Sequence, residues 1–423
     1  MTTVIVGAGA VGLATAYELI KAGDDVVVVD AAAAGQGASH GNAAKIAVGE
    51  CGPVPAPGVL LQGIKWMLRP DSPLSVKPSL APSYLKFMFS MARHCNERDF
   101  RKGLELTLRL AEDANDLLDE YVEDGLDFEM HERGVLLAFE TKERLEEQAT
   151  FLPVWEKYGY PAERLNADEV RQKEPALTER IRYGLSFPTD RQLDPDTLTA
   201  ALVTSIRSAG GKVVENVTVD DFGVSGGKVT AVSLTNGDRL LCDSVVLAAG
   251  VAVRPLANKL GVNLPIHPGK GYSIDYTAPP VDLKTSLTLE DARVAVTPLN
   301  GFLRFAGTME FGSYKNNVSA VRVEAIRRAA RENIRGWATA EATGPDGVGE
   351  RAAWAGMRPM TPDGLPVVGR LHGPSNTYIA GGHGMLGLTL APGTGKHIAD
   401  LVTGRKPRLD RHDQDLISPA RYL

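Results

Sequence analysis

The chain has 423 residues, of which 43% are hydrophobic and 23% charged, and its formal net charge at pH 7 is −6. This length exceeds what one compact core usually supports, so a soluble protein with two domains is expected. The acidic balance argues against nucleic-acid binding. Neither the three cysteines nor the eight histidines have a metal-binding spacing, so no metal is expected. No apolar run reaches the roughly eighteen residues of a membrane-spanning helix.

The first thirty residues carry the most specific pattern, which is strand, glycine-rich turn, helix, strand and acidic residue. The apolar residues 4–6 run straight into Gly7, Gly9 and Gly12, so they predict a buried strand rather than a signal peptide. In such a turn Gly7 allows the tight bend, Gly9 lets the backbone approach a phosphate, and Gly12 lets helix and strand pack closely. Asp30 ends the second strand, where a carboxylate can bind the adenosine ribose. The pattern predicts a dinucleotide site without distinguishing NAD from FAD.

The middle of the chain is predicted to be helical after an irregular stretch. Residues 51–82 contain seven prolines and form either a connector or an ordered loop over a ligand, with Lys65, Trp66 and Met67 as side chains to bury. Apolar periodicity from 99 to 124 predicts one continuous helix. Further helices are predicted over 141–148, after the capping box at 166–169 and over 194–208.

The second half of the chain is predicted to alternate strands and helices. Three apolar runs between 222 and 248, joined by Gly-Gly and Asn-Gly turns, predict an antiparallel meander inside a doubly wound sheet. This insertion is more typical of FAD-binding than of plain NAD-binding domains, and the run 244–250 reads as a central parallel strand. More strands are expected within 262–312 and at 377–380, and helices over 319–335 and 392–402.

Four segments together resemble one family, namely 4–30, 35–44, 354–369 and 381–404. The chain resembles the D-amino acid oxidase superfamily of FAD-dependent amine oxidoreductases over nearly its whole length, and is most similar to the bacterial D-amino acid dehydrogenase branch. The resemblance implies an α/β fold with a Rossmann-like FAD-binding domain and a second, α+β substrate-binding domain. The expected division is 1–85, 165–260 and 354–423 for FAD binding, 86–164 for a helical substrate-side insertion, and 261–353 for substrate binding.

The resemblance implies oxidation of a C–N bond next to a carboxylate. The expected activity is oxidative deamination of D-amino acids by hydride transfer to flavin N5, which yields 2-oxo acids and ammonia. Non-covalent FAD is expected, because no cysteine stands within 354–360, where some relatives attach their flavin. The alternatives are a related oxidoreductase of glycine, sarcosine, an opine or D-hydroxyproline, a nicotinamide-dependent dehydrogenase, and a flavin-binding subunit without its own activity.

Four residues are the candidates for substrate chemistry. Arg358 matches the family's carboxylate-binding arginine, since a guanidinium can hold a carboxylate bidentately, whereas the alternative is a structural ion pair. Tyr272 and Tyr276 lie four apart and so share one face of a strand, either along the substrate or in the core. His383 precedes the closing helix and contributes a hydrogen bond or a proton, or is structural. Arg304 is expected at the surface.

The cofactor contacts expected from the turn and from the resemblance share small side chains or backbone groups. The loop at 39–43 is expected to pass the flavin ring, with Asn42 and backbone contacts favoured over catalysis by His40. The start of the closing helix is expected to stabilise negative charge on reduced flavin, as an oxyanion hole does. The full set is Gly7, Gly9, Ala10, Val11, Gly12, Asp30, Ser39, Asn42, Ala43, Val217, Ala249, Gly250, Gly384, Leu386, Gly387 and Thr389.

The expected partners are an amino acid substrate and an electron acceptor, which is oxygen, a quinone or a partner redox protein. A cytoplasmic location is expected, and peripheral contact with the cytoplasmic membrane fits a quinone acceptor. A homo-oligomer or a place in a larger complex stays open. Side-chain preference and stereochemistry also stay open, because the segments that would form the substrate pocket match the family least.

Overall fold

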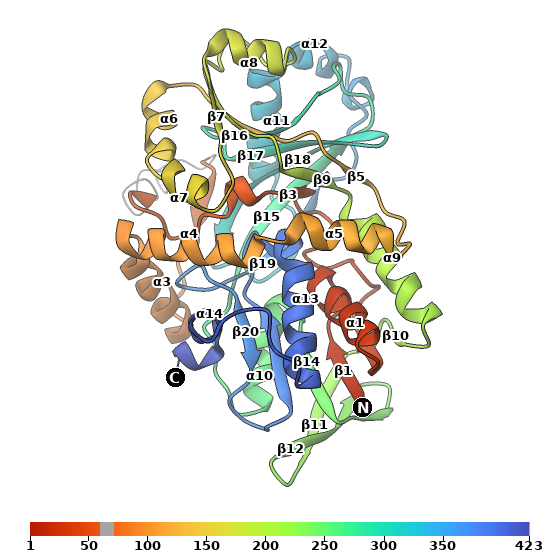
Figure 1. The fold of residues 1–423 in the computed structure, drawn as a ribbon. Helices are drawn as coiled ribbons and strands as arrows, with labels where there is room; N and C mark the ends of the chain where they lie inside the picture. Colours follow the sequence, from red (N-terminus) through yellow and green to blue (C-terminus); the bar gives the residue numbers. More distant parts are fainter. Residues whose placement is uncertain (60–71, 423) are drawn as a thin grey trace.

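The structure is a computed structural model that describes residues 1–59 and 72–422. Residues 60–71, which include Lys65, Trp66 and Met67, lie outside the described residues. The two predictions for the segment 51–82, a connector or an ordered loop over a ligand, depend on these residues and stay open. Two large sheets organise the molecule, one in the lower half of Figure 1 and one in the upper half.

The lower sheet has six strands drawn from three distant parts of the chain. Its order is β10 (Lys212–Val214), β2 (Asp25–Val29), β1 (Thr2–Val6), β14 (Ser244–Leu247), β21 (Thr377–Gly381) and β20 (Val367–Arg370). All neighbours are parallel except β20, which runs antiparallel to β21. The strands around β1 are apolar on both faces, as expected for a parallel sheet covered on both sides. The predicted central strand is therefore β14, beside β1.

Helices cover one face of this sheet and a small meander covers the other. Helices α1 (Ala10–Lys21), α9 (Pro195–Ser208) and α13 (Gly387–Thr403) share one apolar core with Ile5 and Val28. The opposite face packs against α10 (Val253–Lys259) and the antiparallel strands β11 (Val219–Ser225), β12 (Lys228–Leu234) and β13 (Arg239–Leu241). Helix α13 approaches α1 so closely that a Cβ atom on Gly395 would lie 2.7 Å from the backbone of Ala14.

The upper sheet has nine strands, eight of which follow one another in a single path. Its order is β19 (Trp354–Met360), β15 (His267–Tyr276), β18 (Phe302–Phe311), β17 (Val294–Leu299), β16 (Ser286–Leu289), β6 (Val135–Phe139), β8 (Tyr183–Phe187) and β7 (Glu163–Leu165), with β4 (Leu74–Val76) paired to β18. Its outer face packs against α8 (Ala167–Lys173), α11 (Ala320–Asn333) and α12 (Trp337–Glu341). Strand β8 comes from the segment 165–260 and β19 from the segment 354–423, two segments that were expected to belong to the FAD-binding domain.

The remaining elements surround these two sheets. A third sheet orders β3 (Lys45–Ile46), β9 (Arg191–Leu193) and β5 (Met130–His131), and lies beside the larger sheets. The other helices are α3 (Pro82–His94), α4 (Glu97–Ala111), α5 (Ala114–Glu123), α6 (Lys142–Ala149), α7 (Leu152–Lys157) and α14 (Arg411–Ile417), with short 3-10 turns at Val48–Glu50, Gly250–Ala252, Pro345–Gly347 and Pro419–Tyr422. Across residues 1–59 and 72–422, every helix is too short or too polar to cross a bilayer.

The predicted continuous helix over 99–124 is wrong, because the structure breaks it between α4 and α5. The guanidinium of Arg408 pairs with Asp113 and also donates to the carbonyl of Arg109 at 3.4 Å. That carbonyl is the acceptor that an uninterrupted helix would offer to the N–H of Asp113. The tertiary contact thus takes over a helical hydrogen bond that the apolar periodicity implied.

The predicted start of the closing helix at Pro392 is also wrong. Helix α13 begins at Gly387 and carries Pro392 inside its second turn. Proline is most common at the first helical position, which is why the residue looked like a helix start. The earlier start matters for the site, since it moves the N-terminus of α13 to the glycine loop at 381–384.

Candidate active site

A single cavity of about 1150 Å³ runs from the glycine turn after β1 to the inner face of the nine-stranded sheet. Typical ligand pockets hold about 300–1,000 Å³, so this one is large enough for a dinucleotide together with a small substrate. It is bordered by Gly7, Asp30 and Val217 at one end and by Gly271 and Arg358 at the other.

The glycine turn leaves the start of α1 open toward the cavity. Gly7 has φ +115°, and a Cβ atom there would lie 2.5 Å from the carbonyl oxygen of Ala248. Helix α1 begins after Gly9 without a side-chain cap, and the Ala10 N–H donates to Ser39 Oγ at 3.0 Å. Gly12 lies outside the cavity lining, and a Cβ atom on it would lie 1.9 Å from the carbonyl oxygen of Gly7. It therefore serves the close packing of turn and helix that was predicted for it.

Asp30 is fixed by the backbone around it. Its two carboxylate oxygens accept the N–H groups of Ala8 at 2.7 Å and Ala32 at 2.9 Å. Each oxygen keeps further lone pairs, so a ribose hydroxyl could still donate to it. The backbone N–H of Val217 donates to the carbonyl of Asp30 at 3.0 Å, which brings Val217 to the same end of the cavity. An uncapped helix start, glycines without Cβ atoms and an anchored carboxylate fit the pyrophosphate and ribose of a dinucleotide.

The cavity also brings together the remaining residues that the sequence assigns to the cofactor. Asn42 uses its side chain for the loop itself, since it donates to the carbonyl of Ser39 at 2.9 Å and accepts the Ala44 N–H at 2.7 Å. Helix α13 begins here, likewise without a side-chain cap, and Thr389 Oγ1 accepts the N–H of Ala47 at 3.2 Å. The cavity lining includes Gly9, Ala10, Val11, Ser39, Asn42, Ala43, Ala249, Gly250, Gly384, Leu386, Gly387 and Thr389.

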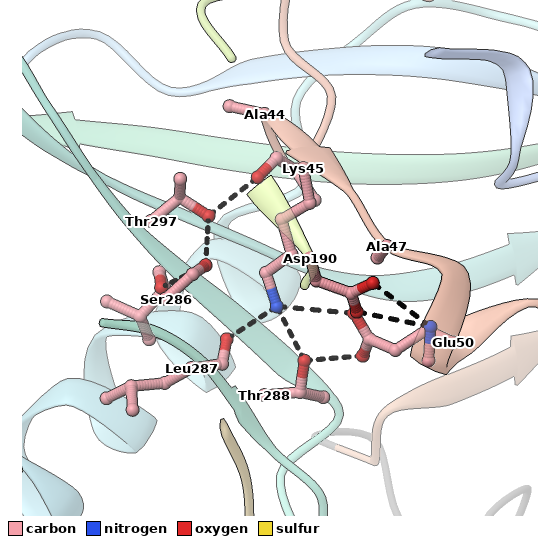
Figure 2. Close-up of polar contacts among 12 residues, drawn as sticks. Ala44, Lys45, Ala47, Glu50, Asp190, Ser286, Leu287, Thr288 and Thr297 are labelled. Carbon is pink, nitrogen blue, oxygen red and sulfur yellow. Dashed lines mark hydrogen bonds and ion pairs between the residues drawn. The ribbon is translucent and has the colours of Figure 1, made fainter. Parts of the chain in front are cut away.

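A buried polar network ties the loop after residue 42 to the nine-stranded sheet (Figure 2). Lys45 Nζ donates to the carbonyl of Leu287 at 2.8 Å and to Thr288 Oγ1 at 2.7 Å, and it pairs with Glu50 at 3.3 Å. Asp190 accepts the N–H of Val48 at 2.9 Å, and burial raises the pKa of its carboxyl to about 8. The sequence analysis missed this network, because its members lie far apart in the chain and form no motif.

Arg358 lies on the inner face of β19 with no acidic partner among the described residues. Its Nη1 donates to the carbonyl of Thr308 at 2.9 Å and lies 3.6 Å from the sulfur of Met309. The surface that Arg358 keeps exposed borders the cavity, and removal from bulk water lowers the pKa of its guanidinium to about 10. An arginine stays protonated at neutral pH, so the cavity holds an uncompensated positive charge.

Tyr272 and Tyr276 share one face of β15, as predicted, but that face packs against the outer helices. The structure does not bring Tyr276 to the cavity: its ring packs edge-on against Phe305 and Trp337. Tyr272 borders the cavity, yet its hydroxyl donates to the buried carboxylate of Glu310 at 3.4 Å. Burial and then Glu310 raise the pKa of the Tyr272 phenol above its ordinary range. The alternation of side chains along a strand correctly placed the two tyrosines on one face of β15. It did not indicate which face of β15 borders the cavity.

His383 is buried in the glycine loop and borders the cavity. Its Nε2 lies 3.0 Å from Thr394 Oγ1, and burial lowers the pKa of the imidazole to about 4. The ring is therefore neutral near pH 7. It can exchange hydrogen bonds there, but it adds no positive charge to the cavity.

Arg304 and His40 form a structural contact beside the cavity. The expected surface position of Arg304 is wrong, since the residue is 3% exposed and pairs with Asp275 at 2.8 Å. Its Nη1 also donates to the carbonyl of His40 at 2.8 Å, so the guanidinium anchors the loop to the sheet. His40 itself pairs with Asp196 at 2.8 Å, and this hydrogen bond raises the pKa of its imidazole.

These features define a dinucleotide-binding protein with a guanidinium that has no acidic partner among the described residues at the far end of its cavity. The chain belongs to the FAD dependent oxidoreductase (DAO) family, whose model matches residues 2–401. Membership confirms the expected family, and it decides between FAD and NAD, which the glycine turn left open, in favour of FAD.

Two relatives and one solved structure are similar to this chain over nearly its whole length. The chain is 34% identical to a D-amino acid dehydrogenase of Methylobacterium nodulans, over 100% of this chain and 99% of the relative. It is 33% identical to a D-amino acid dehydrogenase of Cereibacter sphaeroides, over 98% of this chain and 94% of the relative. The crystal structure of glycine oxidase from Geobacillus kaustophilus matches with a TM-score of 0.77 at 24% identity, over 100% of this chain and 98% of that one. This match confirms the predicted fold class.

Proposed function

We propose that this protein is an FAD-dependent D-amino acid dehydrogenase. The observation that carries the proposal is the uncompensated guanidinium of Arg358 in the cavity that also contains the glycine turn and Asp30. A buried cation without an anionic partner is unfavourable until a ligand supplies one. The α-carboxylate of an amino acid is such a ligand, and the names of the two D-amino acid dehydrogenase relatives support this substrate class.

The residues then divide the work of the reaction. Arg358 binds and orients the carboxylate, which fixes the position of the α-carbon within the cavity. FAD, when bound, supplies the two-electron oxidation by accepting the α-hydrogen as a hydride. The substrate ammonium first releases one proton to solvent, loss of the α-hydrogen as hydride then leaves an iminium with both remaining N–H protons, and water hydrolyses this iminium to the 2-oxo acid and ammonium. No side chain is assigned as a base, because burial keeps His383 a poor proton acceptor at neutral pH.

The closing helix α13 is proposed to stabilise negative charge in the cavity. The uncapped N-terminus of α13 borders it through Gly387, and helix N-termini favour negative charge. We assign two groups to the stabilisation of negative charge on reduced flavin. They are the N-terminus of α13 and the neutral imidazole of His383. Asp30, the glycine turn and Val217 are assigned to the adenosine diphosphate half.

The flavin is proposed to be held without a covalent bond. Cys95 borders the cavity, but its thiol donates to the carbonyl of Met91 at 3.3 Å, and Cys51 is fully buried. Acid precipitation should release the yellow colour into the supernatant. Colour retained in the pellet of the wild type, and lost from it in Cys95→Ser, would show a covalent link instead.

Anaerobic reduction of the purified flavoprotein tests the proposed activity. Bleaching by D-enantiomers and not by L-enantiomers supports it, and 2-oxo acid and ammonia should appear in equal amounts. Preferential bleaching by glycine, sarcosine, an opine or D-hydroxyproline would instead assign one of the related amine oxidations. A protein that binds FAD and is bleached by none of these compounds would refute the proposal and favour a non-catalytic subunit. Repeating turnover with a short-chain quinone and with oxygen identifies the acceptor, for which a quinone is proposed.

A further inference from the structure

A β-bulge lies beside Arg358 on the inner face of the sheet. Tyr272 pairs with Gly307 and Lys270 pairs with Glu310, so Thr308 and Met309 together stand opposite the single residue Gly271. Both bulge residues border the cavity, although successive residues of a regular strand point to opposite faces. The irregularity therefore adds one more residue to the cavity wall, next to the guanidinium.

Thr308 holds an unfavourable backbone conformation in this bulge. Its φ is +60°, in the left-handed region that β-branched residues rarely adopt. Strain of this kind concentrates at functional sites. In this conformation the carbonyl of Thr308 accepts a hydrogen bond from Arg358 Nη1 at 2.9 Å. A glycine would supply the same carbonyl without strain, so the carbonyl alone does not explain a threonine here.

The hydroxyl of Thr308 is the second unfavourable feature. The residue is 5% exposed, and its Oγ1 is buried without a hydrogen-bond partner among the described residues. A buried hydroxyl without a partner is destabilising. Rotation about the Cα–Cβ bond exchanges the positions of hydroxyl and methyl group, and no hydrogen bond holds Oγ1 where it is. The strained backbone, the unpaired hydroxyl and the unpaired guanidinium of Arg358 thus meet at one end of the cavity.

We propose that Thr308 is a second substrate-binding residue, whose hydroxyl donates a hydrogen bond to the carboxylate held by Arg358. This inference rests on the function proposed above. With Nη1 engaged by the Thr308 carbonyl, Arg358 offers Nη2 and Nε to one side of the carboxylate. The hydroxyl adds a neutral donor from β18, so the carboxylate is bound from the two strands that flank β15.

Two variants of the flavin-loaded protein separate the hydroxyl from the shape of the side chain. Thr308→Val keeps the branched shape and removes the hydroxyl, whereas Thr308→Ser keeps the hydroxyl. Benzoate, a carboxylate without an amino group, serves as the probe, and its binding is followed by the flavin absorbance and by the rise in Tm. The wild type should bind it, Thr308→Ser should bind it within about threefold, and Thr308→Val should bind it about 10- to 100-fold more weakly, as expected for a lost hydrogen bond to a charged group.

Stability without the probe distinguishes binding from a structural role. Thr308→Val should unfold at the same or a higher temperature than the wild type, since it removes an unsatisfied buried hydroxyl. Equal benzoate affinity in Thr308→Val and the wild type would overturn the inference. If Thr308→Val fails to fold, Thr308→Ala replaces it, with the same comparison to Thr308→Ser. A wild type that binds no carboxylate and is bleached by no amino acid would refute the proposed function as well, whereas normal turnover with unchanged affinity in the valine variant refutes only this inference.

Discussion

The guanidinium of Arg358 lies directly over Gly271, so that a Cβ atom on Gly271 would overlap Nη1, Nη2 and Cζ. The two residues belong to neighbouring antiparallel strands, where Gly271 pairs with Gly356 and Gly269 with Arg358. The guanidinium thus extends along the inner face of the sheet over backbone that carries no side chain. Its position in the cavity depends on the absence of one methyl group.

Gly271→Ala is expected to displace Arg358 and weaken substrate binding. Overpacking of this kind costs about 1–3 kcal/mol, which corresponds to a KM for amino acids about 5- to 150-fold higher. FAD content should stay normal, because the turn at Gly7 and Asp30 lies at the opposite end of the cavity. If the methyl group acts through Arg358, the double variant Gly271→Ala/Arg358→Ala should be no worse than Arg358→Ala alone. Fully additive losses would show that Gly271 acts by another route.

Arg358→Ala is expected to raise the KM for amino acids by about two to three orders of magnitude, as when one partner of a buried charge pair is removed. Arg358→Lys should recover only part of this loss, because an ammonium lacks the bidentate geometry. Steady-state kinetics with FAD content measured in parallel provide the test. Arg351→Ala, an exposed arginine just before the same strand, is the matched control. Near-normal kinetics in Arg358→Ala would remove the assignment.

Asp30→Ala is expected to weaken flavin binding and to leave the fold intact. The variant loses the acceptor of the Ala8 and Ala32 N–H groups as well as the proposed ribose contact. Loss of hydrogen bonds to a charged group predicts a flavin dissociation constant at least about tenfold higher. Flavin released on dialysis measures the effect, and Asp25→Ala, an exposed carboxylate on the same strand, is the control. Equal flavin retention in both variants would contradict the role of Asp30.

The dinucleotide end of the cavity was predictable because its chemistry is local in sequence. The turn at Gly7 and Gly9 and the carboxylate of Asp30 lie within one strand–helix–strand unit, where spacing alone determines geometry. The substrate end depends on sheet register instead. Tyr272 and Tyr276 were placed on one face correctly, but only the packing of α11 and α12 shows that this face meets the outer helices, which keeps Tyr276 away from the cavity.

Two further residues show what a single sequence does not contain. Arg304 looks like an exposed arginine within a strand, yet Asp275 and the carbonyl of His40 bury it between the sheet and a loop 264 residues earlier. Thr308 follows Gly307 in an ordinary strand pattern, and its exposure to the cavity results from a bulge that pairing with β15 creates. Both depend on contacts between segments that are distant in sequence.

The buried carboxyl of Asp190 should make stability fall as pH rises from about 5 to about 8. Burial raises its pKa to about 8 in the folded protein, against about 3.9 in an unfolded chain. Between these values the folded state holds a proton that the unfolded state has released, so unfolding becomes easier with increasing pH and levels off above the folded pKa. Ionised Asp190 would also face Glu50 in the network of Figure 2.

Asp190→Asn isolates this contribution, because its amide does not ionise while the acceptor for the Val48 and Gly49 N–H groups remains. Thermal unfolding of both proteins should be followed from pH 5 to pH 9, so that titrations common to both cancel in the difference. The wild type should lose Tm relative to Asp190→Asn with each step toward pH 8, and the difference should then stay constant. Parallel curves across this range would mean that Asp190 is already ionised at pH 5, so that burial does not raise the pKa of its carboxyl in the folded protein.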